Sequence, residues 1–161
     1  MDVVRGALDG VDADEVLGAI SEIGDRHGSL IQAVDARYVA GWRHLETAVA
    51  MTNRALERDT TIADDPAMEL LLYVAATRQI DRAIEVGVTN DTSEAVIVVD
   101  GGNEEVAIEE AMSVVSDLSD DLTDVDTIQS WFGISDDELA ATTASLPELV
   151  CERVVLLQLE A

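Results

Sequence analysis

The sequence predicts a mixed α/β (α+β) fold, in which a small mixed β-sheet is flanked by helices within a single domain. Short runs of apolar and β-branched residues at 3–8, 30–34 and 95–99 are typical of strands. Apolar residues recur at helical spacing through most of the remaining chain. Neither an internal repeat nor a linker interrupts this order, so residues 1–161 are expected to form one domain.

The helices follow the strands in a simple order. The first is expected to begin at Asp12 or Asp14, whose carboxylates can cap it, and to be closed by Gly24 and Gly28. The last is preceded by Ser135, which can form a capping box with the acids that follow it. In order, the expected helices cover about 12–23, 36–58, 68–86, 106–115, 126–132 and 136–157, the last disturbed at Pro147.

Residues 68–86 predict one long helix around which the domain is organised. Asp65 can cap its N-terminus, Pro66 suits the first helical position, and Gly87 can end it. On a helical wheel its apolar arc is about twice the ~100° that a surface helix needs to dock on a core. The helix is therefore either central to the domain or in contact with the core on one side and a partner on the other.

The charge of the chain is strongly acidic and unevenly distributed. Thirty-four acidic residues oppose nine arginines, lysine is absent, and the formal net charge is −25. With 48% hydrophobic residues the chain has the apolar content to fold, and such an acidic surface resembles that of proteins from extreme halophiles. Residues 37–82 hold six of the arginines and seven acids, a local balance of −1. Sparing one segment from acid is what contact with a phosphate backbone would require.

The sequence lacks the residue patterns of common enzyme classes. Cys151 is the only cysteine, which excludes an internal disulfide, and no histidine or asparagine motif accompanies it. His27 and His44 fall in different elements, and His44 is expected to make core contacts at the start of a helix. Without a Gly-x-Ser-x-Gly motif, a Walker A loop or a metal-spaced His/Cys cluster, no catalytic residue, metal or cofactor is expected.

Two further stretches exclude other classes of protein. The acid-rich segment 117–126 lacks the glycine and the terminal glutamate of a calcium loop, so we expect a salt-adapted loop there. No apolar run approaches the ~20 residues of a membrane span, and no signal-type segment opens the chain. The sequence therefore predicts a cytoplasmic protein.

Several short motifs occur in an order and spacing that resemble one known family. They are Gly28-Ser29-Leu30-Ile31-Gln32, Asp35-Ala36, Gly41, His44-Leu45, Ala48, Glu69-Leu70-Leu71-Leu72-Tyr73, Thr77-Arg78-Gln79-Ile80, Ala83 and Phe132-Gly133-Ile134-Ser135. Over nearly its whole length the chain resembles the small kinase-associated subunit of the KEOPS complex, the archaeal counterpart of the PRPK-binding protein (the TPRKB-like family).

The resemblance implies a non-catalytic function in tRNA modification. KEOPS installs threonylcarbamoyl on the adenosine next to the anticodon of tRNAs that read codons starting with A, and a separate subunit performs the transfer. The subunit that this chain resembles binds the kinase/ATPase of the complex and the 3′ CCA end of tRNA. Relatives are commonly basic or much less acidic than this chain. The expected tRNA contacts therefore fall on the arginines that remain here. The alternative is a stand-alone small-molecule-binding domain or enzyme of a halophile.

One candidate site is a set of residues for RNA. Arg43, Arg54 and Arg58 align along one side of a predicted helix, although such a row is also typical of a solvated face. Arg78 and Gln79 lie beside the wide apolar arc of the helix predicted at 68–86. Because arginine pairs with phosphate and stacks on bases, and glutamine reads base edges, we expect these five residues to hold the RNA 3′ end.

The second candidate site is the end of the last helix. Residues 149–157 are more apolar than a terminal segment needs. We expect Val150, Val154 and Leu157 to contact the kinase, with packing into the protein core as the alternative reason for their apolar character.

Overall fold

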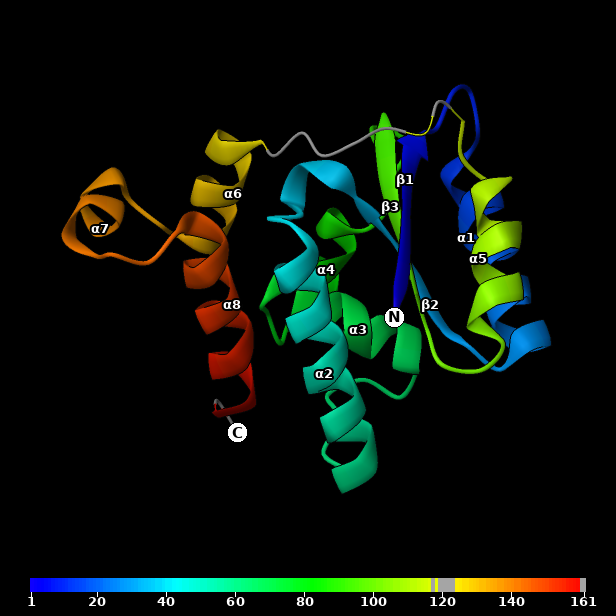
Figure 1. The fold of residues 1–161 in the computed structure, drawn as a ribbon, viewed down its shortest axis with the longest axis horizontal. Helices are drawn as coiled ribbons and strands as arrows, with labels where there is room; N and C mark the ends of the chain where they lie inside the picture. Colours follow the sequence, from blue (N-terminus) through cyan, green and yellow to red (C-terminus); the bar gives the residue numbers. More distant parts are fainter. Residues whose placement is uncertain (117, 119–123, 160–161) are drawn as a thin grey trace.

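Three antiparallel strands form the centre of the molecule in a computed structural model that describes residues 1–116, 118 and 124–159 (Figure 1). The strands are β1 (Asp2–Ala7), β2 (Leu30–Asp35) and β3 (Glu94–Asp100), in the spatial order β1–β3–β2. The expected fold class is confirmed, but the sheet is antiparallel in both described pairings and not mixed. The reason is that β3 runs in the opposite direction between β1 and β2, which never pair with each other.

Helices cover both faces of this sheet and continue beyond it. Figure 1 shows α1 and α5 on one side, α2 and α3 on the other, and α6 to α8 beyond α2. The helices are α1 (Ala13–His27), α2 (Trp42–Arg58), α3 (Pro66–Ala75), α4 (Ile80–Val86), α5 (Glu104–Met112), α6 (Val125–Phe132), α7 (Asp136–Ala141) and α8 (Leu146–Leu156), with 3-10 turns η1 (Ala36–Tyr38) and η2 (Leu157–Leu159).

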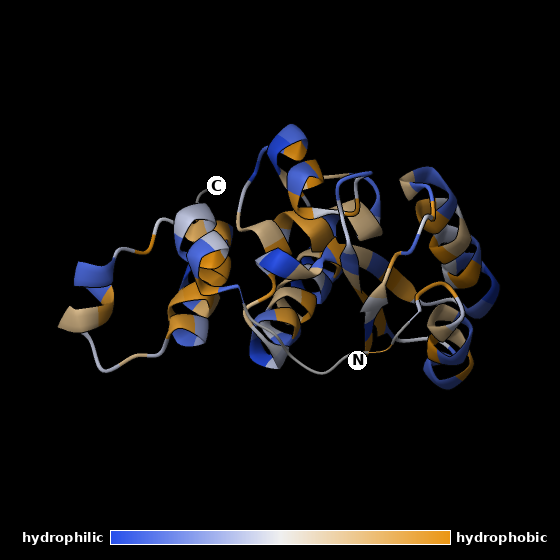
Figure 2. Ribbon diagram, turned by 90° about the horizontal axis from the view of Figure 1, so that it is seen from above, coloured by the Kyte–Doolittle hydropathy of each residue, from blue (hydrophilic) through white to orange (hydrophobic). Residues whose placement is uncertain are grey.

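Strand β3 is buried on both faces, which explains its uninterrupted apolar sequence. Ile97 and Val99 pack with α1 and α5, whereas Val96 and Val98 pack with α2 and α3. Successive side chains of a strand point to opposite faces, so only a sheet covered on both sides needs apolar residues at every position. Figure 2 shows the same arrangement, with hydrophobic strands at the centre and hydrophilic residues on the outer helix faces.

The two outer strands each make one further bridge at their free edge. Ala7 of β1 exchanges two backbone hydrogen bonds with Ser116, and Val34 of β2 bridges to Gly87. Gly6 permits the first approach, because a Cβ there would lie 2.6 Å from the carbonyl oxygen of Ser116.

The predicted helix at 68–86 is two helices, α3 and α4. Asp65 and Pro66 begin α3 as expected, but the helix ends at Ala75 and is followed by Ala76, whose φ of 52° is left-handed. The break is stabilised by side chains from other helices, which donate hydrogen bonds to the carbonyl oxygens of the last turn of α3. His44 donates to the carbonyl oxygen of Val74, and the Trp131 indole donates to that of Ala75 at 2.9 Å. The chain then turns, and α4 ends at Gly87.

Two other predicted helices are also divided. The helix expected at 36–58 begins as the turn η1, capped by Asp35, and α2 starts only after Gly41, whose φ is 130°. The helix expected at 136–157 is interrupted between α7 and α8. Ser135 caps α7 with its side chain, but the Glu138 carboxylate pairs with Arg153 and does not complete the predicted capping box. Ser145 caps α8 and places Pro147 in its first turn, where a missing N–H costs nothing.

The loop before α3 is held by the buried carboxylate of Glu69. Both of its oxygens accept from the Ile62 N–H, at 2.8 and 2.9 Å, and one also accepts from the Ala63 N–H at 2.9 Å. Ile62 packs against the core. A fully buried carboxylate that satisfies two backbone donors fixes this loop to the helix.

Other expectations can be compared directly. The carboxylate of Asp12 caps α1, and Gly28 ends it in the left-handed conformation. The acid-rich loop expected at 117–126 lies mostly outside the described residues. In the described part of the chain, no helix has the length and apolar content to cross a bilayer.

Candidate functional site

Three of the five aromatic residues gather where α6 meets η1 and the end of α3. The rings of Tyr38 and Trp131 meet edge to face at 5.3 Å, and those of His44 and Phe132 at 5.4 Å. Because Trp131 also donates to Ala75, the position of its indole is fixed from two directions.

A hollow of about 270 Å³ opens beside this cluster, and we call it the Arg82–Trp131 hollow. The Arg82 guanidinium lies over the Trp131 ring, 4.6 Å from its centroid, in a cation–π contact. Among the described residues, no carboxylate lines the hollow and Arg82 has no ion pair. The lining residues are Ala75, Ala76, Thr77, Gln79, Arg82, Trp131, Phe132 and Arg153.

Arg153 reaches the hollow from α8 while bonded to its neighbours. Its Nη1 and Nη2 donate to the two carboxylate oxygens of Glu138 on α7, at 2.9 and 2.8 Å. Its Nε donates to the carbonyl of Phe132, and Nη2 also to that of Gly133. The bidentate pairing lowers the pKa of Glu138, which is therefore ionised at neutral pH.

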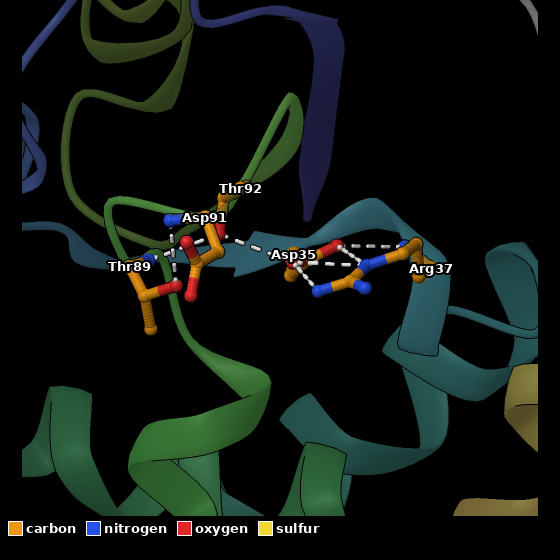
Figure 3. A network of polar contacts seen from close by, with 5 residues as sticks. All are labelled: Asp35, Arg37, Thr89, Asp91 and Thr92. Carbon is orange, nitrogen blue, oxygen red and sulfur yellow. Dashed lines mark hydrogen bonds and ion pairs between the residues drawn. The ribbon is translucent and has the colours of Figure 1, made fainter.

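A second, larger hollow of about 510 Å³ also has Arg82 and Trp131 in its lining. Arg37 lines it and is held by the buried carboxylate of Asp35, which accepts from its Nε, its Nη2 and its backbone N–H (Figure 3). This pairing raises the pKa of Arg37. Thr92 donates to the same carboxylate, so the turn before β3 also fixes it. The remaining lining residues are Tyr38, Asp126, Thr127 and Ser130.

His44 is part of the framework of the site and does not reach solvent. Its Nδ1 accepts from the Ala40 N–H at 3.0 Å, so the proton lies on Nε2, which donates to the carbonyl of Val74 at 2.8 Å. Burial lowers its pKa to about 4, and the imidazole is neutral near pH 7. The expected core contacts of His44 are therefore confirmed.

The predicted RNA residues occupy three places. Gln79 lines the Arg82–Trp131 hollow, and Arg78 is exposed in the same turn. Arg43 lines a shallow hollow between α2 and α8. Arg54 and Arg58 are exposed on α2, ten and fourteen residues beyond His44, which corresponds to about 15 and 21 Å along the helix. The row on α2 therefore does not converge on the hollow that contains Gln79.

Sequence reasoning missed three residues that the structure brings together: Arg82, Trp131 and Arg153. In the single helix predicted at 68–86, Arg82 would lie one turn beyond Arg78, and Trp131 is one of few aromatic residues, so both carried a usable signal. Arg153 carried none, because its position follows only from how α8 packs.

The predicted kinase-binding residues lie in the interior. Val150 and Val154 have no exposed surface, and Leu157 is 2% exposed, because this face of α8 packs on α2 and α6. The exposed apolar residues at this end of the chain are Val155, Leu156 and Leu159. Another exposed apolar pair, Ile80 and Ile84, lies one turn apart on α4.

The described residues contain no group of three His, Cys, Asp or Glu side chains placed to hold a metal ion. A search of curated proteins finds no match. A family model described as "Kinase binding protein CGI-121" matches residues 18–158. The match covers most of the 161-residue chain, including strands β2 and β3 and all residues that line the Arg82–Trp131 hollow, whereas strand β1 lies outside it. The chain therefore belongs to the CGI-121 family of kinase-binding proteins.

Proposed function

We propose that this chain is a non-catalytic regulatory subunit of the KEOPS complex, which binds the kinase/ATPase of that complex and the 3′ CCA end of tRNA. Membership of a kinase-binding family supports the first part. The Arg82–Trp131 hollow supports the second part, and it is the observation on which the RNA assignment depends.

The hollow has the chemistry that an unpaired RNA end needs. Arg82 offers a guanidinium that can pair with phosphate or stack on a base, and it already lies over the Trp131 ring. Gln79 offers an amide that can bond to a base edge. Stacking of single-stranded bases contributes about 1–3 kcal/mol per base and survives high salt better than phosphate contacts do. In a protein of net charge −25, the absence of a carboxylate from the described lining favours an anionic ligand at this place.

The other predicted arginines suit a different part of the same RNA. Arg78 is next to the hollow and is assigned to the terminal nucleotides with Gln79. Arg54 and Arg58 lie too far along α2 to reach those nucleotides, so we assign them, with Arg43, to phosphates that precede the unpaired end. Each phosphate contact of this kind adds affinity that salt weakens.

The short helix α4 can serve both partners at once. Ile80 and Ile84 share one face, whereas Arg82 lies about 200° around the helix from Ile80. We therefore assign the exposed Ile80–Ile84 pair to the kinase, together with the exposed apolar residues at the C-terminal end of the described chain. Those residues are Val155, Leu156 and Leu159.

Filter binding in molar KCl tests the RNA assignment. Wild-type protein should bind intact tRNA more tightly than tRNA lacking its CCA end, and Arg82→Ala should weaken binding to intact tRNA about tenfold, which corresponds to about 1.4 kcal/mol. Arg78→Ala should act in the same direction, whereas the control Arg58→Ala should weaken binding to both RNAs equally. If wild type binds both RNAs equally, the proposed capture of the 3′ end is wrong.

A further inference from the structure

Arg153 carries the second guanidinium that lines the Arg82–Trp131 hollow. This guanidinium is already paired with the carboxylate of Glu138. All three of its nitrogens donate hydrogen bonds in the structure, two of them to Glu138. The side chains of Arg153 and Glu138 are 28% and 35% exposed, so the pair lies at the rim, where a ligand can reach it.

The helix that carries Glu138 is lightly attached. No residue of α7 is buried, and Figure 1 shows it at the end of the molecule, away from the sheet. Besides the Arg153 pair, the described contacts to α7 are the bond from Gln129 Nε2 to Asp136 and the partly buried Leu139. Displacing Glu138 from Arg153 therefore leaves the main core intact.

We propose that Glu138 is an internal competitor for the RNA phosphate, and that Arg153 exchanges this carboxylate for phosphate when the RNA 3′ end enters the hollow. This inference rests on the proposed function of the hollow. A phosphate diester offers two oxygens with the same bidentate geometry as a carboxylate, so either can pair with the guanidinium. While Glu138 holds Arg153, it both occupies the donors and repels the incoming anion.

The competition has a reciprocal consequence. If releasing Glu138 favours RNA binding, RNA binding must to the same extent favour release of Glu138 and loosening of α7. The affinity for RNA and the local stability of α7 are therefore opposed. A purely structural ion pair predicts the contrary, because its loss would misplace Arg153 and weaken RNA binding.

Two charge-matched variants separate these cases. Glu138→Gln removes the competitor, whereas Asp137→Asn removes the same charge from the neighbouring position, where the carboxylate makes no hydrogen bond or ion pair among the described residues. Binding of a single-stranded RNA ending in CCA, in 0.5–2 M KCl, should be about five times tighter for Glu138→Gln than for wild type, since about 1 kcal/mol is typical for such a competing contact. Asp137→Asn should change it less than about twofold.

Several outcomes would overturn the inference. Equal gains in the two variants would reveal only general charge repulsion, and an unchanged or weaker affinity of Glu138→Gln would mean that Glu138 positions Arg153. In either case, a wild-type preference for CCA-ended RNA would still support the proposed function. Without that preference, both the proposed function and the proposed competition by Glu138 are wrong. Hydrogen exchange of the α7 amides in wild type provides a second test, because RNA should accelerate it, and unchanged or slower exchange contradicts the competition.

Discussion

Acidification should destabilise this protein through His44, and His44→Gln should remove that part of the loss. In the folded state the buried imidazole accepts from Ala40 and donates to Val74. A proton on Nδ1 would break the first bond and place a charge in the core, which is why burial lowers the pKa to about 4. The unfolded chain takes up this proton near the ordinary pKa of 6.5, so the contribution is complete above that pH and is lost as the pH falls toward 4.

The two pKa values of His44 set the magnitude. For one group with a pKa of 6.5 when unfolded and about 4 when folded, linkage gives a loss of about 1.3 kcal/mol between pH 7.5 and 5.5. The loss reaches about 2.5 kcal/mol at pH 4.5, a large part of the 5–15 kcal/mol typical of a domain. The protein also loses the stabilising contribution of carboxylates such as Glu138, whose pKa is lowered in the fold, over the same pH range. These carboxylates are common to wild type and variant, so their contribution cancels in the difference between the two.

Urea unfolding at pH 4.5, 5.5 and 7.5, in constant molar KCl, measures this difference. A glutamine side chain can still accept from the Ala40 N–H and donate to the Val74 carbonyl, so we expect His44→Gln to fold. We also expect it to be less stable than wild type at pH 7.5. Its free energy of unfolding should then fall by about 2.5 kcal/mol less than that of wild type on going to pH 4.5. Stability curves that stay parallel to within about 0.5 kcal/mol would refute the assignment of a neutral, buried imidazole to His44.

Three further predictions concern the loop, the salt dependence and the kinase surface. Glu69→Ala should lower the free energy of unfolding by about 2–6 kcal/mol, because the N–H groups of Ile62 and Ala63 lose their acceptor and each unpaired buried donor costs about 1–3 kcal/mol; denaturant unfolding that changes by less than about 1 kcal/mol would contradict this. With a net charge of −25, the urea midpoint should rise between dilute buffer and molar KCl, and a constant midpoint would exclude adaptation to salt. Ile84→Glu should reduce co-purification with the KEOPS kinase while circular dichroism stays native, whereas Val154→Glu should unfold the protein because its side chain is fully buried. Native structure with undiminished kinase recovery for Ile84→Glu would place the interface elsewhere.

Local signals in the sequence were sufficient for elements that are stabilised locally. Residues 95–99 of β3 are all apolar because helices cover both faces of the strand, and a short β-branched run of this kind is typical of a buried strand. The caps Asp12, Asp65 and Ser135 were equally readable, since each accepts from an N–H two or three residues away. The caps depend on neighbours in the sequence, and the sequence displays those neighbours directly.

The break between α3 and α4 could not be read in this way. Helical periodicity continues through Ala76, and nothing nearby opposes it. The carbonyls of the last turn are satisfied by His44 and Trp131, which lie 30 and 56 residues away from their acceptors. The same reason hid Arg153, whose place in the hollow depends on the packing of α8. Tertiary contacts of this range decide both the end of α3 and the composition of the candidate site.

The bridges at the outer strands have a consequence for behaviour in concentrated salt. An open strand edge offers unpaired N–H and C=O groups to a second molecule and can start edge-to-edge aggregation. Charge repulsion normally keeps acidic molecules apart, but in molar salt its range shrinks to about 3 Å. The contacts of Ala7 with Ser116 and of Val34 with Gly87 occupy part of each edge with the chain's own backbone. That protection is steric and hydrogen-bonded, so it persists where repulsion between molecules no longer acts.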